Sequence, residues 1–235
     1  MNFFLFQIYP YIALTVLAVG SIARYERDPF SWKSSSSQLL RQRQFIVGSV
    51  LFHVGVIAIF FGHLVGLLTP IWIWDALGVA HGFKQGVAIG LGGVAGVMAL
   101  AGGAILLHRR LTDPRILATS SNADIAILVM LLVQLVLGLL TILVSLQHMD
   151  GHEMVKFMSW AQGIFTFRTD AWEFVADVNI LFKLHIVLGL TILLVFPFTR
   201  LVHMLSAPVR YLWRPGYQVV RQKPSRAASV RLPAE

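Results

Sequence analysis

Five long apolar segments, separated by shorter polar stretches, follow one another along the chain. A helix that crosses the hydrocarbon of a bilayer needs about 20 consecutive apolar residues. The first segment has no basic residue before it and is longer than the apolar core of a secretory signal, so we interpret it as a retained helix. The sequence therefore predicts an all-α integral membrane protein with five transmembrane helices. Their expected ranges are 3–22, 45–68, 87–107, 123–145 and 181–203.

The composition supports a membrane protein and limits the chemistry that the chain can hold. Of the 235 residues, 57% are apolar and only 13% are charged, which is about half the charged share of a soluble protein. Cysteine is absent. This excludes iron–sulfur clusters and thiolate zinc sites held by this chain, so any cofactor must be bound through histidine, methionine or oxygen ligands.

Basic residues are distributed unequally between the two sides of the predicted bundle. Five lie in the first loop, three in the third loop and seven on the C-terminal side, whereas the opposite side carries four. Because cytoplasmic loops are enriched in Lys and Arg, the N-terminus is expected outside and the C-terminus in the cytoplasm.

Residues 1–215 are expected to form the transmembrane domain, and 216–235 a basic, mobile cytoplasmic tail. The long outer loop, 147–179, should include an amphipathic segment at the membrane interface.

Four of the eight histidines fall in or at the ends of two predicted spans, His53 and His63 in the second, His185 and His203 in the fifth. An ionisable side chain is costly in a bilayer and indicates a functional site. Metal ligation is one interpretation; a structural or proton-relay role is the other. His63 and His185 lie about 7.5 Å and about 6 Å from the outer ends of their helices. At this shared depth they can bind one metal.

The remaining two histidines, His53 and His203, are expected to form an inner site. Their depths match less closely, because His53 lies about 12 Å from the inner end of its helix and His203 lies at the very end of its own. Helix tilt, or a kink at Pro197, would reduce the mismatch. On a continuous helix, His185 and His203 would point the same way, because 18 residues complete five turns.

Two imidazoles per metal in an apolar bundle favour a bis-histidine haem b. Zinc and copper also accept imidazole, but their sites usually gather three or four ligands. Glycines beside the histidines (Gly55, Gly62, Gly66 and Gly189) would let a planar ligand approach closely. The same glycines are also compatible with helix–helix packing.

Four other polar residues stand out. Lys84 is the sole basic residue of the second loop, just ahead of the third span. It is either an interfacial lysine that extends to the lipid headgroups or a hydrogen-bond donor to a polar head near the outer metal site. Gln134 is expected to form an interhelical hydrogen bond. Arg109 and Arg110 are expected to anchor the inner surface or to pair with haem propionates.

With these features, the sequence resembles the gamma subunit family of membrane-bound respiratory nitrate reductases, which are dihaem b cytochromes. The resemblance implies that His53 and His203 ligate the proximal haem b, nearer the cytoplasm, and that His63 and His185 ligate the distal haem b. It also implies that Lys84 binds quinol. The matching stretches are IYPYIA, SSQLL, LFHVGVIAIFFGHLVGLLTP, LLHRRLTDPR, QHMDG and KLHIVLGL with FPFTRLVH.

The resemblance implies the quinol-oxidising subunit of a quinol:nitrate oxidoreductase in the bacterial cytoplasmic (inner) membrane, with menaquinol or ubiquinol as substrate. Electrons would pass through two b haems to an iron–sulfur beta subunit and then to a molybdenum-containing alpha subunit. No nitrate-reducing site is expected in this chain. Two alternatives stay open. One is a dihaem cytochrome b of another quinone-linked reductase, and the other is a cofactor-free transporter whose histidines relay protons.

Overall fold

The structure, a computed structural model, describes residues 1–32 and 39–206. Within these ranges the chain forms helices and no strand. The predicted tail, 216–235, lies outside the described residues. In chain order the elements are η1 (Phe4–Ile8), α1 (Tyr9–Arg27), η2 (Pro29–Ser31), α2 (Gln42–Leu68), α3 (Ile71–Ala76), α4 (His81–Thr112), α5 (Pro114–Ala118), α6 (Asn122–Ser145), α7 (His152–Phe165), η3 (Ala171–Val175), α8 (Ile180–Val195), η4 (Phe196–Phe198) and η5 (Arg200–Ser206).

Five of these helices are long and apolar enough to cross a membrane, which confirms the predicted number of spans. They are Phe4–Arg27, α2, α4, α6 and Ile180–Phe198. The third begins at His81, six residues before its predicted start, because the polar stretch ahead of the apolar segment continues the same helix. The direction in which the bundle crosses the membrane stays a prediction.

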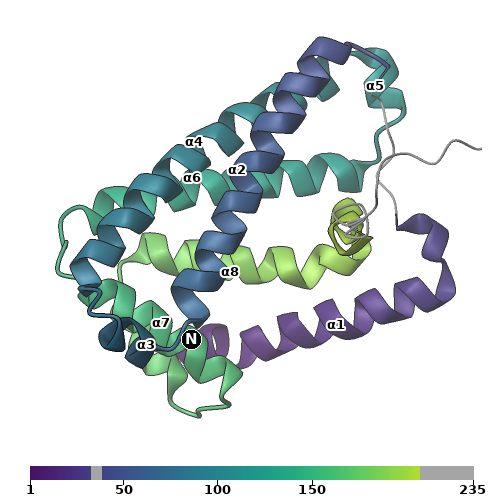
Figure 1. Cartoon of the computed structure of the whole chain (residues 1–235). Coiled ribbons are helices and arrows are strands. Elements are labelled where there is room, and N and C mark those ends of the chain that lie inside the picture. Colours follow the sequence, from purple (N-terminus) through teal and green to yellow (C-terminus); the bar gives the residue numbers. More distant parts are fainter. Residues whose placement is uncertain (33–38, 207–235) are drawn as a thin grey trace, which may run out of the picture.

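Helix α2 packs on α4, α4 on α6 and α6 on α8, each pair antiparallel, and α8 packs on α1, with which it runs parallel (Figure 1). One end of the bundle, here called the α7 end, carries α3 and α7; the other, the α5 end, carries α5 (Figure 1). The basic residues predicted on the inner side, as far as they are described, lie in the elements of the α5 end. We therefore equate the α5 end with the predicted cytoplasmic side.

The contact between α2 and α4 is made by backbone as well as side chains. A Cβ atom added at Gly55 would lie 2.6 Å from the carbonyl oxygen of Ala95 and 2.8 Å from the Cβ of Ala99. Only glycine allows such an approach. This contact fixes α2 against α4, and the opposite side of α2, including His53 and His63, is exposed.

The long loop contains the amphipathic helix that the sequence predicts. This helix, α7, buries Met158, Ala161 and Ile164 against the bundle. Trp160 donates from Nε1 to the carbonyl oxygen of Phe6 at 2.8 Å. The segment is therefore attached to the first span by a hydrogen bond as well as by its apolar face.

Candidate functional site

The four membrane histidines come together as the two pairs that the sequence predicts. The ring centres of His63 and His185 lie 6.2 Å apart, and their planes make an angle of 36°. The ring centres of His53 and His203 lie 6.4 Å apart, with an angle of 71°. In each pair one ring comes from α2 and the other from the chain at or beyond α8. The first pair lies toward the α7 end and the second toward the α5 end.

Both separations match the span of one metal ion held between two imidazoles. With metal–nitrogen distances of about 2.0 Å, and each ring centre about 1.1 Å behind its nitrogen, the ring centres would be separated by about 6.2 Å. Among the described residues no group of three or more His, Asp or Glu side chains could hold a metal ion. A site with two protein ligands suits a haem, because the macrocycle supplies the other four nitrogens.

Backbone carbonyls orient three of the four rings. His53 Nδ1 lies 2.8 Å from the carbonyl oxygen of Ser49, His63 Nδ1 lies 2.9 Å from that of Ile59, and His203 Nδ1 lies 2.5 Å from that of Arg200. A carbonyl oxygen can only accept, so each Nδ1 carries the hydrogen. The lone pair is then on Nε2, which is the arrangement of a metal-binding histidine.

His185 is oriented by α6. Gln134 donates from Nε2 to the carbonyl oxygen of His185 at 3.0 Å and lies 3.4 Å from His185 Nε2, which confirms the predicted interhelical hydrogen bond. A Cβ atom at Gly138 would lie 3.0 Å from Cε1 of the same ring. Because Gly138 has no side chain, the imidazole of His185 can pack closely against α6.

The predicted fifth span is not one continuous helix to His203. Helix α8 ends at Val195, because Pro197 has no N–H to donate to the preceding turn. Thr199 is extended, with φ −118° and ψ 179°. The expectation that His185 and His203 point the same way along one helix is therefore wrong. The kink expected at Pro197 is confirmed, and the turn that follows it brings His203 to His53.

The glycines near the histidines divide into two groups. A side chain at Gly62 or Gly66 would meet no atom within 4 Å, so the chain leaves space beside His63, as a bulky planar ligand requires. Gly55 faces α4, and a Cβ atom at Gly189 would lie 3.1 Å from Gln134 Nε2. These two glycines serve helix packing, the second of the two interpretations.

The guanidinium of Arg110 is a further feature that suits a haem at the α5 end. Its Nη1 is buried and has no hydrogen-bond partner among the described residues. A buried cationic donor without an acceptor is costly, and a haem propionate would supply the acceptor. Arg109, in contrast, donates to the carbonyl oxygen of Leu40 at 2.5 Å and packs over the ring of Phe45, as expected of an anchor of this end.

Lys84 lies in the first turn of α4 rather than in the preceding loop, and its side chain is buried, with 8% exposed. Its ammonium donates to the sulfur of Met158 at 2.6 Å and lies 5.0 Å from the ring centre of Trp74. A thioether and an aromatic face are weak partners for an ammonium group. Asp75, in α3, contributes a nearby negative charge. The side chain is therefore enclosed between α3 and α7 rather than extended toward the lipid surface.

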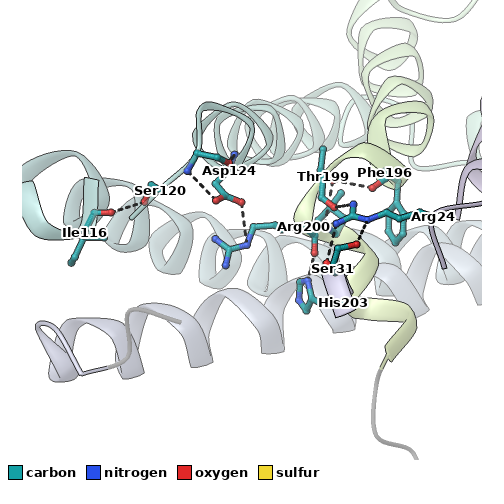
Figure 2. A network of polar contacts seen from close by, with 11 residues as sticks. Arg24, Ser31, Ile116, Ser120, Asp124, Phe196, Thr199, Arg200 and His203 are labelled. Atoms are coloured by element: carbon teal, nitrogen blue, oxygen red, sulfur yellow. Dashed lines mark hydrogen bonds and ion pairs between the residues drawn. The ribbon is translucent and has the colours of Figure 1, made fainter. Parts of the chain in front are cut away.

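Arg24 is one of the five basic residues that follow the first span, and nothing in the sequence sets it apart from the others. In the structure, its guanidinium contacts the chain between α8 and η5 (Figure 2). No local pattern reveals this role, because the carbonyl groups that it binds are 173 and 175 residues away in the sequence.

Comparison with known proteins gives matches over nearly the whole chain. The family described as nitrate reductase gamma subunit matches residues 2–223. The chain is 50% identical over 223 residues to the respiratory nitrate reductase 2 gamma chain of Escherichia coli (strain K12), which covers 95% of this chain and 98% of the relative. It is 38% identical over 219 residues to the nitrate reductase gamma chain of Bacillus subtilis (strain 168), covering 93% and 97%.

Proposed function

This chain belongs to the nitrate reductase gamma subunit family, and we propose that it oxidises quinol at the α7 end and delivers the electrons to partner subunits at the α5 end. Its membership makes it a subunit of an oxidoreductase complex, and its five apolar helices make it a multi-pass membrane protein.

The observation that carries the proposal is the spacing of the two histidine pairs. Separations of 6.2 and 6.4 Å between ring centres, together with three Nδ1 groups bonded to carbonyl oxygens, suit two bis-histidine b haems. His63 and His185 would hold the distal haem, and His53 and His203 the proximal one. When bound, the haems supply two one-electron carriers in series between the two ends of the bundle.

Lys84 is proposed to bind the quinol. It belongs to the α7 end, as does the His63–His185 pair, and its present partners are weak acceptors. An ammonium group can donate to a quinol oxygen and stabilise the negative charge that forms as the proton leaves. Oxidation of one quinol releases two protons and two electrons. The protons leave on the outer side and the electrons cross to the inner side, so the reaction adds to the membrane potential.

The α5 end is proposed to dock an iron–sulfur beta subunit, which passes the electrons to a molybdenum-containing alpha subunit. This end is rich in arginine, and electrostatic attraction to an acidic protein surface would favour docking. The chain has no cysteine, so the next electron carrier must belong to another protein. The bacterial cytoplasmic membrane is the proposed location.

Haem content of the complete complex in membranes tests the proposal. We expect two b haems per chain, with His63→Ala or His185→Ala losing one reduced-minus-oxidised signal and His53→Ala or His203→Ala losing the other. The control is His148→Gln, which changes an exposed histidine outside both pairs.

Two outcomes would contradict the proposal. A wild-type preparation without haem would favour the proton-relay transporter. Two haems that quinol reduces but nitrate does not reoxidise would favour a different terminal reductase.

A further inference from the structure

The chain between α8 and η5 has backbone groups that need partners. Residues that leave a helix lose the donors that would bond to their carbonyl oxygens. Here Pro197 follows the end of α8 and Thr199 is extended, so the carbonyl group of Pro197 lies outside the regular bonding of α8, and that of Thr199 lies at the start of η5. In a bundle surrounded by lipid, unsatisfied carbonyl groups are costly.

One side chain donates hydrogen bonds to the carbonyl groups of both Pro197 and Thr199. Arg24, in the last turn of α1, donates from Nη1 to the carbonyl oxygen of Pro197 at 2.7 Å and to that of Thr199 at 2.8 Å. Figure 2 shows its guanidinium between Ser31 and Thr199. Arg24 thus holds the backbone on both sides of Phe198.

Arg24 is itself fixed by η2. Its Nε donates to Ser31 Oγ at 3.1 Å, and its Nη2 donates to the carbonyl oxygen of Ser31 at 3.0 Å. The hydroxyl of Ser31 in turn donates to the carbonyl oxygen of Asp28 at 2.8 Å. The planar guanidinium therefore has a fixed orientation, which a lysine could not reproduce.

Helix α1 also contacts the break directly. A Cβ atom at Gly20 would lie 2.9 Å from Cγ of Pro197. The proline ring cannot move aside as a flexible side chain would, so the close approach depends on glycine at this position. Gly20 and Arg24 are four residues apart and therefore lie on the same side of α1.

The fixed break leads directly to His203. The hydroxyl of Thr199 accepts a hydrogen bond from Leu201 N at 3.3 Å, at the start of η5. Arg200 lies 3.6 Å from Asp124 of α6, and its carbonyl oxygen accepts the bond from His203 Nδ1 at 2.5 Å. The position of the His203 ring is thus determined by the backbone that Arg24 holds.

We propose that Arg24 is a positioning residue for His203 and, through it, for the inner His53–His203 pair. This inference rests on the proposed function, because its readout is the haem at that pair. Arg24 contacts neither ring. It acts by fixing the carbonyl groups of Pro197 and Thr199, and its effect should be confined to one of the two haems.

The test uses the complete complex in membranes, with EPR spectra and redox titrations of both haems. Arg24→Gln is expected to shift or abolish the EPR signal and the midpoint potential of the inner haem and to leave those of the outer haem unchanged. Arg24→Lys should show the same defect, because one ammonium cannot replace the guanidinium contacts to both carbonyl groups and to Ser31. Arg27→Gln, which removes an exposed arginine of the same turn, should leave the signals and potentials of both haems unchanged.

A second variant leaves Arg24 in place. Gly20→Ala would push on Pro197 and is expected to perturb the same inner signal, whereas Gly92→Ala, where nothing lies within 4 Å, should not. If the Arg24 variants assemble with both signals and both potentials unchanged, the inference is wrong. Loss of both haem signals in Arg24→Gln, with Gly20→Ala unaltered, would also overturn it. Absence of haem from the wild type would instead contradict the proposed function.

Discussion

The imidazole rings of His53 and His203 cross at 71°, whereas those of the other pair, His63 and His185, are inclined by 36°. The difference arises because His203 belongs to the turn η5 after the break, while His185 lies within α8. The two sites therefore present different orientations of the same ligands.

These angles predict two distinguishable EPR signals. In low-spin ferric haems, the signal becomes more anisotropic as the axial imidazole planes approach the perpendicular, so the inner haem should give the larger maximum g value. Spectra of the oxidised complex, compared with those of His53→Ala and His63→Ala, would assign each signal. The prediction is wrong if the more anisotropic signal disappears with His63.

Gln134 should influence the outer haem alone. It donates to the carbonyl oxygen of His185 and lies beside its ring. Groups that orient a metal ligand typically affect metal affinity by about 10- to 100-fold when removed. We expect Gln134→Leu to weaken retention of the outer haem by roughly tenfold during detergent extraction. Haem spectra at increasing detergent exposure would measure this loss.

The control for Gln134 is Thr141→Val, since Thr141 bonds to the carbonyl oxygen of Gly138 within the same helix. Equal loss of both haems in Gln134→Leu would indicate general destabilisation of the bundle rather than a local effect.

The sequence predicts the helices and the outer histidine pair because both follow from hydropathy and depth. His63 and His185 lie at similar distances from the ends of their spans, so their pairing needs no further information. The approach of His203 to His53 could not be derived in the same way. It depends on the helix break at Pro197 and on the hydrogen bonds from Arg24 to the carbonyl groups of Pro197 and Thr199. These hydrogen bonds join the first span to the last.

The local sequence was also insufficient to predict the surroundings of the glycines and of Lys84. Gly55 is two residues from His53, yet it faces α4, because its orientation on the helix differs from that of the histidine. Lys84 follows a polar stretch that resembles a loop, but the stretch continues α4 and places the side chain against Met158. In both cases the neighbouring helix, and not the nearby sequence, determines the environment.

Replacement of Lys84 should reduce reaction with quinol and preserve both haems. Removing one hydrogen-bond donor to a buried substrate oxygen should cost about 1–3 kcal/mol, or about 5- to 150-fold in rate or affinity. Haem reduction by quinol in membranes would be compared between wild type and Lys84→Ala. Reoxidation of chemically reduced haems by nitrate should be unchanged, since it does not require the quinol site.

The matched control for Lys84 is Lys156→Ala. Lys156 belongs to the same end of the bundle and forms an ion pair with Glu153 at 2.7 Å. Reduction of the Lys84→Ala haems by quinol at the wild-type rate would assign Lys84 a structural role only.

Asp113 should make the α5 end sensitive to acid. Burial opposes its ionisation, but hydrogen bonds from the backbone N–H groups of Arg115 and Ile116, together with the charges of Arg115 and Arg41, hold the pKa of Asp113 below its ordinary value. Its carboxylate lies 3.1 Å from Arg41 Nε. Because the pKa is lowered in the folded state, ionised Asp113 stabilises the fold. This stabilisation is fully present above the pKa of Asp in the unfolded chain, about 3.9, and is lost as the pH falls through the pKa of the folded state.

The difference in Tm between wild type and Asp113→Asn should therefore be constant between about pH 5 and 7 and shrink below about pH 4. Asp28→Asn, at the same end, controls for the loss of a carboxylate. A difference that does not change with pH would mean that Asp113 acts by packing and not by its charge.

Each histidine pair combines a residue of α2 with one from the last quarter of the chain, 122 positions later for His185 and 150 for His203. During biosynthesis, the first ligand of each pair enters the membrane long before the second has been translated. A cofactor that needs both rings can be captured only after the final helix has inserted and the chain has turned at Pro197. On the proposed function, haem acquisition is therefore expected to be a late step of biogenesis, before which the inserted apoprotein must persist.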